Sequence, residues 1–209
     1  MTGDELDRDS WDRRWSQALG AGAHAVDQRP PNAHLLAEVA DLSPGLALDA
    51  GAGHGAETLW LASRCWRVDA VDFSTTALEY ARVRAERLGA DVAGRVEWIA
   101  ADLATWIPPP ERYDLVVCLY VHIAGSVPAL LRRLAAGVAT DGTLLLVGHR
   151  PIDPATGAGT PAAGQVQVSV DEALSALDPE RWEIVVAEDR PRAVAGSGVD
   201  AVVHARRHT

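Results

Sequence analysis

The sequence predicts an α/β fold: a doubly wound sheet that is mostly parallel and has an antiparallel end. Strand-like and helix-like segments alternate along most of the 209 residues, and such alternation implies right-handed crossovers between parallel strands. The strand-like segments are rich in Val, Leu and Ile, which is typical of strands buried on both faces. Two final strand-like segments are joined by a loop too short for a crossover helix, so we expect them to be antiparallel.

The expected elements follow from hydrophobic periodicity and from turn residues. Strands are expected at Leu46–Ala50, Arg67–Asp72, Arg95–Ala100, Tyr113–Tyr120, Thr143–His149, Trp182–Glu188 and Val199–Ala205. Helices are expected at Ala56–Cys65, Thr75–Leu88 and Val127–Ala139. Ser74 is the expected N-cap of the second helix, which places Leu78, Ala81, Ala85 and Leu88 on one face. The prolines of Ile107–Pro110 indicate a loop.

Composition limits the class of partner. The net charge of −10 argues against nucleic acid, because affinity for nucleic acid depends largely on neutralising phosphates. The apolar runs are too short to span a bilayer, and the acidic N-terminus lacks the apolar core of a secretory signal. We therefore expect a cytoplasmic protein without a membrane partner. Cys65 and Cys118 are too few for a disulfide framework and are expected to be buried thiols.

The most informative segment is LALDAGAGHG, which begins at Leu46. Gly51, Gly53 and Gly55 let the backbone approach a ligand between a strand and the N-terminus of a helix. The segment also satisfies the G-x-G-x-x-G/A pattern of dinucleotide sites. Asp49 before the first glycine and the antiparallel chain end favour a different ligand, one with a cationic group that an acid can meet.

LALDAGAGHG resembles the D-x-G-x-G-x-G motif of class I S-adenosylmethionine-dependent methyltransferases, and the resemblance covers nearly the whole chain. It looks most similar to the small tellurite-resistance and thiopurine-type enzymes. The resemblance implies a Rossmann-like sheet of seven strands, with the last inserted antiparallel between the fifth and sixth. It also implies S-adenosylmethionine as the cofactor and S-adenosylhomocysteine as its product.

The resemblance assigns the cofactor site residue by residue. Asp49 and the three glycines match the loop around the methionine portion, and Asp72 matches the acid that accepts both ribose hydroxyls. An acid at that position could instead cap the helix that follows Ser74. The remaining matches are Phe73 and Asp102 at the adenine, Leu103 through its backbone N–H, and Cys118 in the strand end nearest the transferred methyl. Asp102 could also be an exposed loop acid.

His122 and Tyr120 are the first candidates for acceptor contact or proton removal, and His149 is the next. An imidazole can act as a base near neutral pH, but only an acceptor with a proton of high pKa needs one. A histidine hydrogen-bonded at a strand end is the structural alternative. No metal is expected, because His149 and Asp153 alone make a poor ligand set.

The 209 residues are expected to form a single domain. The N-terminal region, residues 1–32, carries Trp11 and Trp15 one helical turn apart and is expected to act as a lid segment. A tryptophan pair at this spacing more often docks a terminal helix on the core. The Pro151–Gln167 segment (residues 151–167), rich in Pro, Gly and Ala, is expected to be a substrate-side loop.

The predicted function is methyl transfer by in-line displacement to a small-molecule acceptor. Sulfur, selenium or tellurium species, halides, small amines, phenols and natural-product scaffolds remain open as acceptors, as does the oligomeric state. Two other functions use the same loop: a nicotinamide-dependent oxidoreductase, and a non-catalytic protein that binds S-adenosylmethionine.

Overall fold

The structure is a computed structural model that describes residues 12–13, 15–17, 30–122, 125–153, 155–159, 169–192 and 198–208. The chain divides into two compact units, Thr2–Trp106 and Ile107–Thr209. The single domain expected from the sequence stays a prediction.

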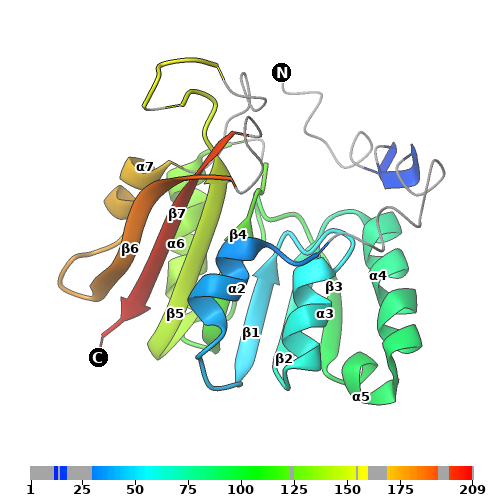
Figure 1. The fold of residues 1–209 in the computed structure, drawn as a ribbon. Coiled ribbons are helices and arrows are strands. Elements are labelled where there is room, and N and C mark those ends of the chain that lie inside the picture. The colour runs from blue at the N-terminus through cyan, green and yellow to red at the C-terminus, as the bar shows by residue number, and fades with distance from the viewer. Residues whose placement is uncertain are drawn as a thin grey trace. The chain divides into compact units, whose positions relative to one another are not determined.

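The Thr2–Trp106 unit contains three parallel strands in the order β3-β2-β1, drawn in cyan to green in Figure 1. Helices α3 and α4 pack on these strands. Its elements are α2 (Ala33–Val39), β1 (Leu46–Ala50), α3 (Ala56–Ser63), β2 (Arg67–Asp72), α4 (Thr75–Leu88), α5 (Ala90–Ala93) and β3 (Val96–Ala100). The glycine loop joins β1 to α3 and therefore follows the carboxyl end of a buried parallel strand.

The Ile107–Thr209 unit has the strand order β4-β5-β7-β6. Strand β5 is parallel to β4, whereas β7 is antiparallel to both β5 and β6 and lies between them (Figure 1). Helices α6 and α7 pack against each other. The elements are β4 (Tyr113–Leu119), α6 (Val127–Gly137), β5 (Val138–His149), α7 (Val170–Ala176), β6 (Trp182–Pro191) and β7 (Val199–Arg207).

These elements confirm the predicted fold class, which is α/β and Rossmann-like. The described residues form seven strands, mostly parallel, with the antiparallel last strand inserted between β5 and β6. Strands β1, β2, β4, β5 and β7 are mostly buried, as expected, and Leu115–Val117 and Leu144–Leu146 are fully shielded from solvent. Strands β3 and β6, expected to be buried as well, are mostly half-buried or exposed. Ser74 caps α4 as predicted, since its hydroxyl accepts the N–H of Ala77 at 3.2 Å.

The helix expected at Val127–Ala139 ends at Gly137, because Val138 and Ala139 belong to β5. Two expectations about the burial of side chains were also wrong. Cys65 is exposed, because α3 ends at Ser63 and Cys65 adopts a left-handed φ of 69° in the turn that follows. Leu88, expected on the buried face of α4, is 58% exposed at the last residue of that helix, where packing no longer covers it. Cys118 is buried in β4 as expected.

The sequence reading missed α7, whose start carries a clear signal. The Ser169 hydroxyl accepts the N–H of Glu172, and the Glu172 carboxylate accepts the N–H of Ser169. This reciprocal pair is a capping box, which an S-x-x-E pattern before an apolar stretch predicts. Among the described residues, no helix combines the length and apolar character that a membrane crossing needs.

Candidate active site

The glycine loop is held by backbone bonds and requires glycine. The N–H groups of Gly51 and Ala52 donate to the carbonyl of Val71 at 2.8 and 3.0 Å, which ties the loop to β2. Gly51, Gly53 and Gly55 have φ values of 92°, 51° and 80°, in the left-handed region that side chains disfavour. A Cβ on Gly55 would also lie only 2.8 Å from the Cβ of Ala81. The spacing of the glycines thus follows from backbone conformation and from close packing.

Asp72 joins the loop to the end of β2. Its carboxylate accepts the N–H of Gly53 and the N–H of Ser74, both at 2.9 Å, and the residue is buried. Burial raises the pKa of Asp72, and the backbone donors of Ser74, Gly53 and Phe73 act in the opposite direction. The carboxylate therefore holds both the helix start and the glycine loop. The ribose contact assigned to it stays a prediction, as does the contact of half-buried Phe73 with adenine.

Two further carboxylates stand beside the start of α3. Asp49 is 3% exposed and accepts the hydroxyl of Thr58 at 2.5 Å. Burial, with the nearby charges of Glu57 and Asp72, raises the pKa of Asp49 to about 7. Glu57 accepts the N–H of Asn32 at 3.0 Å, and burial raises its pKa as well. We call Asp49, Glu57 and Asp72 the acid cluster.

The acid cluster determines which ligand charge suits the loop. In dinucleotide sites the helix N-terminus after the glycines receives a diphosphate, because its N–H groups and dipole favour an anion. Here Glu57 lies in the first turn of α3, and Asp49 bonds Thr58 in that same turn. A diphosphate would oppose the ionisation of these acids, whereas a cationic ligand would stabilise their charged forms. The loop therefore fits a ligand with a positive group.

Three other predicted cofactor residues are divided between the two units. Asp102 is exposed after β3, and its carboxylate accepts the N–H of Ala104 at 2.8 Å, while the next residue, Leu103, is buried. In the other unit Cys118 is buried in β4, where it is in register with Leu146 of β5. Their contacts with a cofactor stay predictions.

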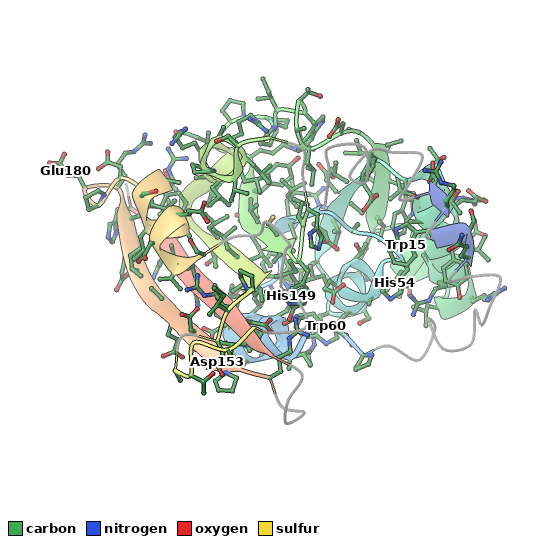
Figure 2. All side chains as sticks on the ribbon, turned by 90° about the horizontal axis from the view of Figure 1, so that it is seen from above. Trp15, His54, Trp60, His149, Asp153 and Glu180 are labelled. Carbon is green, nitrogen blue, oxygen red and sulfur yellow. The ribbon has the colours of Figure 1, made fainter. Side chains whose placement is uncertain are left out.

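The structure brings Trp15 to the glycine loop. The Trp15 ring lies 5.4 Å from that of His54, centroid to centroid, and Figure 2 shows the two side by side. A Cβ on Gly53 would be 3.0 Å from an atom of the indole. Trp11 and most of residues 1–32 lie outside the described residues, as do 154 and 160–167 of the Pro151–Gln167 segment. The lid and the substrate-side loop stay predictions.

In the Ile107–Thr209 unit, Tyr120 and His149 come together. Their rings stack with centroids 3.9 Å apart, and both side chains form hydrogen bonds with the fully buried Asp200. The Asp200 carboxylate accepts from Tyr120 Oη at 2.8 Å, from His149 Nδ1 at 2.9 Å and from Arg192 Nε at 3.0 Å. We call these four residues the Asp200 cluster. His122 is half-buried two residues beyond Tyr120.

Tyr120 directly follows β4 with a φ of 55°, a backbone conformation that is uncommon for a bulky side chain. Such outliers persist where their surroundings enforce them, and they concentrate at functional sites. Here the hydroxyl bond to Asp200 and the ring contact with His149 hold the conformation in place.

The sequence reading missed Glu57, Asp200 and Arg192. An acid in the first turn of a helix that follows a glycine loop was a usable signal for Glu57. Asp200 stands out as an acid within an apolar strand, but its pairing with His149 arises from the β5–β7 register. Nothing local singles out Arg192, which follows β6 as its first loop residue.

Comparisons with known proteins bear on both sites. Residues 47–142, which contain the glycine loop, match a family model described as a methyltransferase domain. A "Probable thiol methyltransferase 2" from Arabidopsis thaliana is 30% identical over 186 residues, which cover 86% of this chain and 78% of the relative.

Two solved structures show the same fold. TehB from Haemophilus influenzae superposes with a TM-score of 0.69 and 17% identity, over 88% of this chain and 65% of that one. The N-methyltransferase NodS from Bradyrhizobium japonicum WM9, solved with S-adenosyl-L-homocysteine, gives a TM-score of 0.66 and 18% identity, over 92% of this chain and 98% of that one.

The raised pKa of Asp49 predicts a pH dependence of stability. Asp49 titrates near 7 in the folded protein and near 3.8 when unfolded, so between these values only the folded state keeps the proton. The protonation of Asp49 therefore stabilises the folded state at low pH, and this stabilisation is lost as pH rises from about 3.8 to about 7. We expect the free energy of unfolding in urea to fall between about pH 5 and about pH 8. The fall should be larger for the wild type than for Asp49→Asn, by on the order of a few kcal/mol.

Asp91→Asn, which changes an exposed carboxyl in α5, serves as the control and is expected to follow the wild type. An equal loss of stability in the wild type and in Asp49→Asn would show that Asp49 does not titrate in this range.

Proposed function

Because the chain belongs to the class I S-adenosylmethionine-dependent methyltransferases, we propose that the acid cluster and the glycine loop hold S-adenosylmethionine and that the acceptor is a small thiol. The protein transfers a methyl group from S-adenosylmethionine to a small-molecule acceptor. What remains to be assigned is which residues hold each reactant and which acceptor atom is methylated.

The acid cluster carries the cofactor assignment. S-adenosylmethionine has a sulfonium and an ammonium group, both positive, and it supplies a methyl carbon that a nucleophile can attack. Asp49 and Glu57 place two acids with raised pKa values at the start of α3, where a cation would stabilise their charged forms and a diphosphate would oppose them. Asp72 is buried at the end of β2, and its carboxylate accepts a hydrogen bond from the N–H of Gly53. This position suits a residue that contacts a ribose beside the loop. These observations support the cofactor over a nicotinamide dinucleotide.

Two observations support a thiol as the acceptor. The relative that matches over most of the chain is described as a thiol methyltransferase. A thiol has an ordinary pKa near 8.5, so at neutral pH it is mostly protonated, and an imidazole such as that of His149 is a suitable base for it. The thiol's electron pair would form the bond to the methyl carbon while the carbon–sulfur bond of the sulfonium breaks.

The cofactor assignment predicts the effect of Asp72→Asn. This isosteric change removes the charge that would accept the ribose hydroxyls, and we expect the Kd for S-adenosylhomocysteine to rise at least about tenfold by calorimetry. Asp69→Asn is the matched control, because Asp69 is a buried acid of β2 whose side chain points to the opposite face of the sheet. Equal affinity in Asp72→Asn and the wild type would remove Asp72 from the cofactor site.

The acceptor assignment predicts the outcome of a competition. Equimolar 2-mercaptoethanol, phenol and ethylamine are incubated with protein and S-adenosylmethionine, and methylated products are separated by mass spectrometry. We expect S-methylated product to exceed the other two by at least about tenfold, since a thiol is the better nucleophile near neutral pH. Preferential methylation of phenol or amine would contradict the thiol assignment and leave the cofactor assignment intact.

A further inference from the structure

The Asp200 cluster draws its side chains from the ends of four strands. Tyr120 follows β4, His149 ends β5, Arg192 follows β6, and Asp200 is the second residue of β7. In open α/β sheets, ligands bind outside the carboxyl ends of the parallel strands, and β4 and β5 both end at this cluster. The polar contacts thus gather where a ligand is expected, and they include a buried carboxylate and a base.

The hydrogen bonds determine the tautomer of His149. Arg192 Nη2 lies 2.9 Å from His149 Nε2, and a guanidinium can only donate. Nε2 therefore carries a lone pair, and the ring proton sits on Nδ1, 2.9 Å from Asp200. An acid that holds Nδ1–H leaves Nε2 as the basic nitrogen, the arrangement found where an imidazole removes a proton from a nucleophile.

Arg192 and an incoming proton compete for the same nitrogen. While the guanidinium donates to Nε2, His149 cannot accept a proton there from a bound acceptor. Arg192 also lies with its Cζ 5.4 Å from the centre of the Tyr120 ring. The side chains of Arg192 and His149 are 28% and 21% exposed, against 1% for Asp200. Asp200 is thus the fixed member of the cluster, and both Arg192 and His149 can be reached by solvent and ligands.

Arg192 can exchange its hydrogen bond to His149 Nε2 for a stronger hydrogen bond to another acceptor. A guanidinium bonds a charged oxygen more strongly than a neutral nitrogen, and it matches a carboxylate with two parallel N–H groups. An acceptor that carries a carboxylate would offer Arg192 this better partner. The Nε–H bond to Asp200 could persist through the exchange, since it uses a different nitrogen of the guanidinium.

We propose that His149 is the base that takes the acceptor's proton at Nε2, positioned by Asp200, and that Arg192 uncovers this nitrogen when it binds an anionic group of the acceptor. The inference rests on the proposed function. The acceptor is then a small thiol that also bears a carboxylate. Its S–H proton passes to Nε2, its electron pair bonds the methyl carbon, and the sulfonium carbon–sulfur bond breaks with its pair kept on sulfur. The imidazolium afterwards returns the proton to water.

The first test observes His149 directly. The full chain is labelled with ¹⁵N in its histidine rings and saturated with S-adenosylhomocysteine, and His149 is assigned through His149→Asn. The probes are 3-mercaptopropionate and 3-mercaptopropionamide, which match in size and differ in charge. We expect only the carboxylate to move the Nε2 signal. In Arg192→Gln, neither probe should move it.

The second test is turnover of the same two thiols with S-adenosylmethionine. We expect kcat/KM for the carboxylate to exceed that for the amide at least about tenfold, and Arg192→Gln to abolish this preference. Asp200→Asn is expected to lower kcat far more than it changes KM. Arg206→Gln is the matched control, because Arg206 is an exposed arginine of β7 that pairs with Asp141 at 3.5 Å.

The outcomes separate the two proposals. Three results would each overturn this inference: equal Nε2 shifts with both thiols, no shift with either, or a charge preference that survives Arg192→Gln. The cluster would then have only a structural role, as a contact between β5 and β7. Failure of S-adenosylhomocysteine to bind would instead overturn the proposed cofactor site. Should Asp200→Asn not fold, the Arg192→Gln results decide alone, because Arg192 is partly exposed.

Discussion

The Thr2–Trp106 unit depends on one buried carboxylate. Asp72 accepts the N–H of Gly53 and the N–H of Ser74, and so joins the glycine loop, the end of β2 and the start of α4. A buried carboxylate without donors would cost several kcal/mol or take up a proton, and these backbone bonds oppose both outcomes. The loop conformation, with left-handed φ at Gly53, is therefore coupled to the charge state of a residue 19 positions further along the chain.

Charge then distinguishes between two ligands that the same glycine pattern can accept. The dipole of α3 favours an anion at its start, but Asp49 and Glu57 place two acids there, and burial raises the pKa of each. These carboxylates would be more stable beside a cation. The Ile107–Thr209 unit differs in kind, since Arg192 and His149 surround its buried carboxylate. The first arrangement fits the cofactor site that we propose, and the second fits the acceptor site that we propose.

How far the sequence predicts this arrangement depends on the distance along the chain between interacting residues. Asp49, the glycines and Asp72 belong to one strand–loop–helix–strand unit, so local spacing located them and the strand limits of β1 and β2 were correct. The family resemblance supplied the inserted antiparallel strand. Asp200 was missed because its partners Tyr120 and His149 lie 80 and 51 residues away and meet it only through the β5–β7 register. Cys65 and Leu88 were misjudged because both lie where a helix ends and periodicity no longer reports burial.

We propose above all that the acid-lined glycine loop binds a cationic adenosyl cofactor and no dinucleotide. Calorimetric titration of the purified full chain with S-adenosylmethionine, S-adenosylhomocysteine and NADH, side by side at one pH and salt concentration, tests it most directly. We expect both adenosyl ligands to bind and NADH to give no binding heat. Binding of NADH alone would contradict this proposal and make the loop a dinucleotide site.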